Sequence, residues 1–357
     1  MNYDLDFRPY QVPFSKPLVT NHGSWKVREG IIIRLTEALG QVSYGEIAPI
    51  PWFGSETLAE ALQFCQGLPK KLSLEEINTI PDRLPATQFA FSSSLEVLKA
   101  PLLQENLERS PFTLPTLNPH STYSYLLPTG IAAIDSWQTP WQQGYRTFKQ
   151  KIGVDHPHQE LDQIQQLVNL LPEGAKLRLD ANGGIDFTTT KLWLEECDRL
   201  KIKHPVNTKK VAIPPNPPSK RGRLDFPSKE GFIEFLEQPL PVENFRDLLT
   251  LADKYETAIA LDESVATLRQ LETCYSQGWR GIFVIKPSIA GFSDRLREFC
   301  HHNTIDAVFS SSLETAIGRD HALKLAMELS NPHRALGFGV DHWLKINQET
   351  LIRQLWQ

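Results

Sequence analysis

From about residue 121 onward, short apolar runs alternate with helical periodicity, and each run ends in polar residues. The run Ile282-Phe283-Val284-Ile285 is apolar at every position, which is typical of a parallel strand buried on both faces. The predicted strands cover residues 123–130, 147–153, 176–183, 232–239, 258–265, 281–288, 306–313 and 335–339. Eight strands that alternate with helices predict a (β/α) barrel, in which catalytic groups lie at the carboxyl ends of the strands.

The first hundred or so residues mix strand and helix patterns instead. Residues 30–35 and 41–47 predict two paired strands with Gly40 in the turn. Ser55 suits the N-cap of a helix that runs through Leu62, and a second helix is predicted over residues 86–98. Strands followed by helices favour a small α+β unit.

The expected organisation is therefore an α+β domain over residues 1–118 and a barrel domain over residues 119–339. The C-terminal segment, about residues 340–357, is expected to complete the first domain. A length of 357 residues suits one barrel-sized domain with a smaller companion.

Charged residues at the predicted strand ends recur at the spacing of one βα unit. The intervals Lys151 to Asp180, Glu237 to Asp262, Asp262 to Lys286 and Lys286 to Ser310 are 29, 25, 24 and 24 residues. Asp180 to Glu237 is longer, at 57 residues, but it contains residues 204–231 with six prolines, six Lys or Arg and two acids. That composition predicts a disordered or extended insertion on the face opposite the active site, and without its 28 residues the interval returns to 29. A basic interaction segment is the alternative.

Carboxylates end three successive predicted strands. Asp180 is followed two residues later by Asn182, and Glu237 and Asp262 end the next two strands. Each acid alone could be a helix N-cap. Three of them in one barrel mouth would repel each other, and a hard cation with oxygen ligands resolves that repulsion. The sequence therefore predicts a Mg²⁺ site, and Mn²⁺ accepts the same ligands.

Lysines flank these acids. Lys149 and Lys151 are two residues apart on one strand and so share a face. Mutual repulsion and partial burial are expected to lower a lysine pKa toward the value that a general base needs. Lys286 follows the apolar run 282–285 and is expected across the mouth from Lys151, with the metal between them.

As a set, these motifs resemble the enolase superfamily, muconate-lactonizing-enzyme subgroup. The motifs are Lys149-x-Lys151, Asp180-x-Asn182, Glu237-Gln238-Pro239, Asp262-Glu263-Ser264 and Lys286-Pro287. The resemblance implies a modified TIM barrel with an α+β capping domain, and a Lys base beside Mg²⁺.

Within that subgroup, segments 25–30, 45–51, 55–57, 308–315 and 337–341 are similar to the o-succinylbenzoate synthase family. This implies elimination of water from 2-succinyl-6-hydroxy-2,4-cyclohexadiene-1-carboxylate in menaquinone or phylloquinone synthesis. Lys151 would take the proton and return it to the leaving hydroxyl, and Lys286 would be a fixed cation. Lys149 would tune Lys151, and backbone N–H groups of the seventh-strand segment would bind a substrate carboxylate. The substrate-contact residues implied are Lys149, Arg178, Asn182, Ser310, Ser311, Ser312 and Gly339.

Two other functions are open at this point. An N-acylamino-acid racemase or dipeptide epimerase would use the same metal ligands, with Lys151 and Lys286 as opposed bases. A non-catalytic scaffold acting through the basic insertion would be a function of another class. A dehydration assay separates the first from a synthase, and full dehydration activity in Lys151→Ala would favour the second.

The amino-acid composition excludes some classes of binding partner. A net charge of −5 and a pI near 6.1 give no basic field for nucleic acid or anionic membranes. The sequence lacks a run of eighteen apolar residues, and its acidic N-terminus lacks a signal core, so we expect a cytoplasmic protein without a membrane span. The expected partner is a small-molecule carboxylate. The sequence leaves the oligomeric state open, and a monomer is compatible with it.

Overall fold

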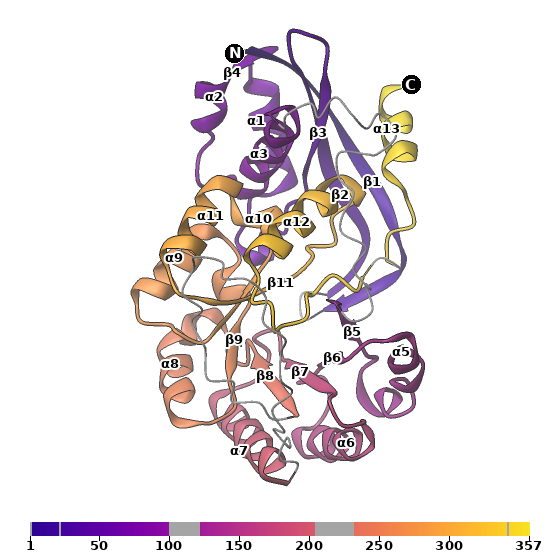
Figure 1. Cartoon of the computed structure of the whole chain (residues 1–357), viewed down its shortest axis with the longest axis vertical. Helices are drawn as coiled ribbons and strands as arrows, with labels where there is room; N and C mark the ends of the chain where they lie inside the picture. Colours follow the sequence, from indigo (N-terminus) through magenta and orange to yellow (C-terminus); the bar gives the residue numbers. More distant parts are fainter. Residues whose placement is uncertain (1, 21–22, 100–121, 204–231, 341–342) are drawn as a thin grey trace, which may run out of the picture.

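The structure is a computed structural model that describes residues 2–20, 23–99, 122–203, 232–340 and 343–357. Within these ranges it has a four-stranded antiparallel sheet and a seven-stranded parallel sheet. The antiparallel sheet and its helices lie above the parallel sheet in Figure 1. The capping-domain and barrel architecture expected from the sequence is confirmed. The expected boundary at residues 118 and 119 lies outside the described residues.

The antiparallel sheet has the order β3-β2-β1-β4 and packs on three helices. Its elements are β1 (Asn2–Thr20), β2 (Gly23–Thr36), β3 (Val42–Ile47), α1 (Leu58–Gly67), β4 (Lys71–Ser73), α2 (Leu74–Asn78) and α3 (Pro85–Lys99). The predicted pair 30–35 and 41–47 is confirmed, with Leu35 opposite Ser43. The sequence did not reveal β1, because Pro9, Pro13 and Pro17 are atypical of strands. β4 pairs only with residues 2–4, so most of β1 is an edge strand, where proline is tolerated.

The start of α1 differs from the prediction. Thr57, not Ser55, is the N-cap, and it forms a capping box with Glu60. The Ser55 hydroxyl instead accepts a hydrogen bond from the Ile50 N–H group at 2.7 Å. Ser55 therefore fixes the turn before the helix. The helix predicted over residues 86–98 is confirmed as α3.

The barrel strands pair in chain order from β5 to β11. Its elements are β5 (Ser124–Leu126), α5 (Gln138–Gln143), β6 (Thr147–Lys151), α6 (Pro157–Leu170), β7 (Lys176–Asp180), α7 (Phe187–Lys203), β8 (Ile233–Glu237), α8 (Phe245–Lys254), β9 (Ile259–Leu261), α9 (Leu268–Ser276), β10 (Ile282–Ile285), α10 (Pro287–Ala290), α11 (Ser293–His302), β11 (Asp306–Phe309) and α12 (Ala316–Leu329).

The predicted eighth strand, residues 335–339, is not a regular strand. It forms one bridge to each edge of the sheet, Tyr123 with Leu336 and Ser310 with Gly337. Backbone hydrogen bonds such as Gly337 N–H to Phe309 O at 2.7 Å hold it there. The segment therefore closes the barrel through isolated contacts rather than a continuous ladder.

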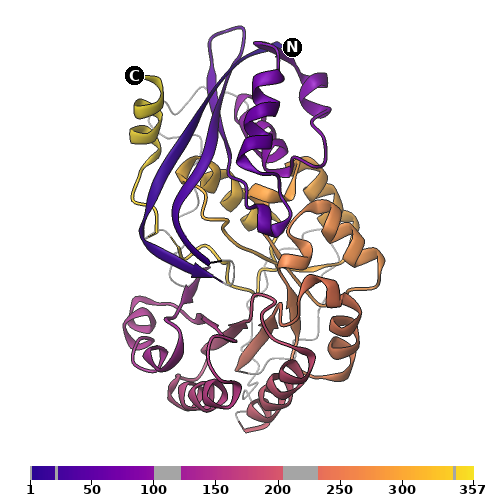
Figure 2. The same cartoon turned by 180° about the vertical axis from the view of Figure 1, so that it is seen from behind.

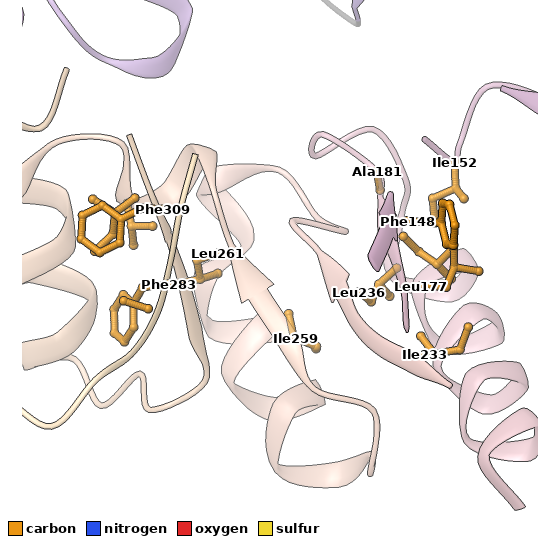
Figure 3. Packing of buried hydrophobic residues seen from close by; sticks show 14 of the residues in the cluster. Phe148, Ile152, Leu177, Ala181, Ile233, Leu236, Ile259, Leu261, Phe283 and Phe309 are labelled. Atoms are coloured by element: carbon orange, nitrogen blue, oxygen red, sulfur yellow. The ribbon is translucent and has the colours of Figure 1, made fainter. Parts of the chain in front are cut away.

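Successive side chains along each barrel strand point alternately toward the surrounding helices and toward the barrel interior. Phe148, Leu177, Leu261 and Phe283 point outward and pack under the helices (Figure 3). A smaller apolar cluster is contributed by the inward-facing positions, Phe235, Ala260, Ile282, Val284 and Val308. The charged strand-end residues share this inward phase, so they converge at the carboxyl ends of the strands.

Contacts tie the capping domain to the barrel. Glu46 of β3 is fully buried and accepts hydrogen bonds from Thr315 N–H and Gly318 N–H, both at 2.9 Å, at the start of α12. The last helix, α13 (Gln348–Trp356), packs beside the long β1–β2 hairpin (Figure 2), where Leu351 joins Tyr10 and Ile32. Residues 204–231 lie outside the described ranges. No helix in the described part of the chain is long and apolar enough to cross a membrane.

Candidate active site

A cavity of about 170 Å³ lies between the capping domain and the carboxyl ends of the barrel strands. Ten of the residues expected from the sequence line it: Lys149, Lys151, Asp180, Asn182, Asp262, Lys286, Ser310, Ser311, Ser312 and Gly339. Glu237 lies just behind them and contacts Lys149. The spacing of one βα unit thus brings the predicted residues together.

The three strand-end carboxylates are almost completely buried, with Asp180, Glu237 and Asp262 each at most 3% exposed. The Lys149 ammonium lies 2.8 Å from both Asp180 Oδ2 and Glu237 Oε1. The Lys286 ammonium bonds to Asp262 Oδ1. With both lysines against the acids, the described residues contain no group of three His, Cys, Asp or Glu already arranged to hold a metal ion.

The charges around these carboxylates do not balance. Glu263 adds a fourth buried acid, and the facing cations are Lys149, Lys151 and Lys286. Burial and the neighbouring Asp180 raise the pKa of Glu237 to about 7. Burial likewise raises the pKa of Asp262, although Lys286 opposes it. The cluster is therefore short of positive charge, which an additional cation with oxygen ligands would supply.

The expected effect of the lysine pair on pKa is wrong for Lys149. Burial alone would lower its pKa, but Asp180 and Glu237 outweigh burial and raise it above the ordinary range. Lys149 is therefore a fixed ammonium group. Asp180 is correspondingly held ionised, because Lys149 and Lys151 lower its pKa in spite of burial.

The two candidate catalytic lysines lie on opposite sides of the carboxylates. Lys151 ends β6 and Lys286 follows β10, with β7, β8 and β9 between them in the sheet. The Lys151 ammonium is 3.5 Å from Asp180 Oδ2 and bonds to Asn182 Oδ1. The Lys286 ammonium is more buried and lies 4.3 Å from the centre of the Phe53 ring. Both lysines line the cavity, and Lys286 is the more enclosed of the two.

Gln238 organises the end of β9. It adopts a positive φ of 34°, and its Oε1 accepts the N–H groups of Asp262 and Ser264 at 3.0 and 3.1 Å. Its Nε2 donates to Leu240 O and Ser264 Oγ. This amide holds the backbone that carries Asp262, a role that its place in the motif did not disclose.

The seventh-strand segment differs from what the resemblance implies. The N–H groups of Ser310, Ser311 and Ser312 donate to Ile285 O, Gly337 O and Glu314 Oε2, respectively. These groups are therefore already used within the protein. By contrast, Ser310 Oγ is buried in the cavity wall and has no hydrogen-bond partner among the described residues. The hydroxyl, rather than the backbone, is available to a ligand here.

Arg178 is not in the cavity wall. Its Nε donates to Glu234 Oε2 at 2.7 Å and its Nη2 to Ala335 O at 2.8 Å, deeper in the barrel. The expected substrate contact is not supported by this position. Conversely, Glu263 and the capping-domain residues Trp25 and Phe53 line the cavity but carried no predicted role. These three residues lie in or next to the sequence motifs, and that position was the only indication of a role in the site that the sequence offered.

The chain is similar to known proteins along its whole length. A family model described as MenC, N-terminal domain, matches residues 5–98. The o-succinylbenzoate synthase of Thermosynechococcus vestitus is 38% identical over 98% of both chains, and that of Yersinia enterocolitica is 28% identical over 89% of this chain and 84% of the other.

Solved structures agree. The crystal structure of o-succinylbenzoate synthase from Thermosynechococcus elongatus BP-1, complexed with Mg in the active site, has a TM-score of 0.81, 38% identity and 99% coverage of both chains. The muconate lactonizing enzyme of Pseudomonas putida has a TM-score of 0.68 at 16% identity, covering 96% of this chain and 91% of the other, which is a likeness of fold alone.

Barrel, cap and strand-end acids between two lysines define an enzyme with the fold that o-succinylbenzoate synthases share with muconate lactonizing enzymes. The chain belongs to the o-succinylbenzoate synthase family, whose members are carbon–oxygen lyases.

Proposed function

We propose that this protein eliminates water from 2-succinyl-6-hydroxy-2,4-cyclohexadiene-1-carboxylate to give 2-succinylbenzoate, in menaquinone or phylloquinone biosynthesis. The observation that carries the proposal is the placement of Lys151 and Lys286 on opposite sides of three buried carboxylates in one cavity. Family membership supplies the substrate. The remaining steps follow from the residues around the cavity.

We infer that Asp180, Glu237 and Asp262 hold one Mg²⁺. All three offer carboxylate oxygens, and burial together with the neighbouring Asp180 raises the pKa of Glu237, so a cation here would stabilise its ionised form. Lys149 would have to leave its present position between Asp180 and Glu237, and its 22% exposed side chain gives it a route toward the cavity. When bound, the ion would supply positive charge beside the substrate carboxylate and so acidify the adjacent C–H bond.

Lys151 carries the proton in this proposal. As the free amine it takes the proton from the carbon next to the substrate carboxylate. As the ammonium it then gives that proton to the departing hydroxyl, so the products are water and the ring. Both transfers occur on one face of the substrate, which matches the position of Lys151 on one side of the cavity. Aromatisation of the ring makes the step strongly downhill.

Lys286 acts as a fixed positive charge on the other face. Its bond to Asp262 and its position on the Phe53 ring enclose the ammonium. That surrounding suits charge stabilisation better than proton abstraction. It therefore favours the dehydratase over the racemase or epimerase, which needs a second base.

The remaining substrate contacts are assigned to other residues of the cavity wall. Ser310 Oγ is placed to donate to a substrate carboxylate, because it is buried and lacks a partner among the described residues. Lys149 and Asn182 lie beside the metal ligands, and Ser311 and Ser312 shape the wall next to Ser310. Gly339 keeps that wall close to β5, since a Cβ there would lie 2.4 Å from Ser124 O.

The test is the absorbance change of ring aromatisation when the diene acid is supplied with Mg²⁺. Turnover that disappears on chelation and returns with Mg²⁺ supports the proposal, and Mn²⁺ is tested in the same titration. Racemisation of an N-acyl amino acid without any dehydration would refute it.

A further inference from the structure

Glu263 is a buried acid in the cavity wall to which the proposed reaction gives no task. It is 7% exposed and follows Asp262 directly, at the start of the turn after β9. Its Oε1 accepts a hydrogen bond from Asn182 Nδ2 at 3.1 Å. Its Oε2 is buried without a hydrogen-bond partner in the described part of the chain. A buried carboxylate oxygen without a hydrogen-bond donor is energetically costly, which points to a function that retains it.

Asn182 connects this acid to the proposed base. Its backbone N–H donates to Asp180 Oδ1 at 3.0 Å, and its φ of +45° lies in the left-handed region. The side-chain Oδ1 accepts from Lys151 Nζ while Nδ2 faces Glu263. An amide has two orientations that differ by exchange of its O and NH₂ groups. A carboxylate can only accept, so Glu263 favours the orientation that turns Oδ1 toward Lys151.

That orientation matters most when Lys151 is a free amine. A neutral amine has two N–H donors and one lone pair. Asn182 Oδ1 and Asp180 Oδ2 are placed to take the two donors, so the lone pair is left for the substrate. With the amide reversed, Nδ2 would donate into the lone pair and block it. An ammonium repels the reversed amide by itself, but a free amine does not.

We propose that Glu263 is a positioning residue that fixes the Asn182 amide and thereby keeps the Lys151 lone pair directed into the cavity. This inference rests on the proposed function of Lys151. It gives Glu263 no contact with the substrate and no place among the metal ligands. Removing the acceptor should therefore slow the chemical step at saturating Mg²⁺ without weakening substrate binding, whereas any loss of Mg²⁺ affinity from the missing negative charge should be the same in every uncharged variant.

The experiment measures kcat, KM and Mg²⁺ affinity, the last by calorimetry, which needs no turnover. At saturating Mg²⁺, Glu263→Ala should lower kcat about 10- to 100-fold, the range for loss of an orienting hydrogen-bond partner, with KM changed less than about threefold. Glu263→Gln keeps an acceptor for Asn182 Nδ2 and should retain most of kcat. Glu263→Met keeps the volume without the acceptor and replaces Glu263→Ala if that variant does not fold.

The decisive arm is a double-mutant cycle. If Glu263 acts through Asn182, Glu263→Ala should have little further effect on kcat in an Asn182→Ala background. Additive losses would overturn the proposal, and so would unchanged kcat in both Glu263→Ala and Glu263→Met. A Mg²⁺ affinity that falls much further in Glu263→Ala than in the equally uncharged Glu263→Gln would make residue 263 a metal ligand instead. Absence of dehydration by the unmodified enzyme is a separate outcome, which would refute the proposed function.

Discussion

The barrel buries charged side chains at both ends of its strands, and the two ends differ in the ratio of positive to negative charges. At the amino ends, Arg178 and Arg334 face Glu234 and Asp306, two cations against two acids. Burial alone would raise the pKa of Glu234, but Arg178 and Arg334 outweigh it and lower the pKa. At the carboxyl ends, four acids face three lysines, and Glu237 is left with a raised pKa.

This difference separates a structural network from a reactive site. A matched network has its charges neutralised in the folded protein and needs nothing further. An unmatched cluster stores unfavourable charge that a metal ion or a substrate can relieve. The two ends should accordingly respond to different perturbations, the carboxyl end in turnover and the amino end in stability.

The largest effect is expected at the carboxyl end from Lys151→Ala. Loss of the group that moves the proton should lower kcat about 10³-fold, within the range for acid–base groups. The free energy of unfolding should change by less than about 1 kcal/mol, because the side chain is partly exposed and Asp180 keeps Lys149. Aromatisation kinetics and urea titration measure the two quantities, with the exposed Lys254→Ala as control. Full activity would remove Lys151 from the mechanism and revive a non-catalytic reading.

At the amino end, Arg178→Met should show the reverse behaviour. Glu234 would lose its closest partner in a buried setting, so the free energy of unfolding should fall by about 3–5 kcal/mol. Turnover by the protein that remains folded should stay within a few-fold. Arg353→Met, on the exposed face of α13, is the matched control. Wild-type stability with a hundredfold loss of kcat would show that Arg178 serves the substrate after all.

The effect of Mg²⁺ on the free energy of unfolding distinguishes the two ends of the barrel without an activity assay. At a concentration 100 times its dissociation constant, an ion that binds only the folded protein adds about 2.7 kcal/mol to the free energy of unfolding. We expect this gain in the wild type and in Arg178→Met, and its loss in Asp262→Asn. Thermal unfolding with and without MgCl₂, at matched ionic strength, measures it. An equal gain in Asp262→Asn would place the ion elsewhere.

The smallest effect is expected from replacing residues 204–231 with a short Gly-Ser linker. The described chain resumes at the amino end of β8 (Ile233–Glu237), whereas the proposed site lies at the carboxyl ends of the strands. Turnover should therefore stay within about twofold of the wild-type value in the aromatisation assay. A tenfold loss would mean that this segment contributes to the site.

The sequence predicted the carboxyl end better than the amino end for a physical reason. Strand-end acids recur with the βα period, and that period survives any change in helix packing. Arg178 has the same inward phase as Asp180, so alternation could not tell that its partner lies deeper. Its partner Glu234 lies at an irregularity of the β7–β8 ladder, where Leu177 pairs with Ile233 but Arg178 with Phe235. Such a bulge breaks the alternation on which the prediction depends.

The side-chain hydrogen bonds of the site could not be predicted from the sequence either. The family resemblance implied that backbone N–H groups of the segment around Ser310-Ser311-Ser312 bind the substrate, yet which of its groups are free depends on Glu314 and on the segment 335–339. The tasks of Gln238 and Glu263 likewise depend on partners from other strands. Contacts between distant parts of the chain leave no local periodicity to read.

The bond between Glu46 and the start of α12 has a consequence for synthesis of the chain. Glu46 is separated from Thr315 and Gly318 by 269 and 272 residues. During translation the capping sheet emerges first, and its interface carboxylate, Glu46, has the Tyr10 hydroxyl as a donor but lacks its partners in α12 until nearly the whole barrel has been made. Contacts between such distant residues form late. The barrel-facing surface of the capping sheet therefore stays exposed to solvent until the barrel has folded against it. A chain released before residue 318 would carry an open cap and most of a barrel but no finished pocket.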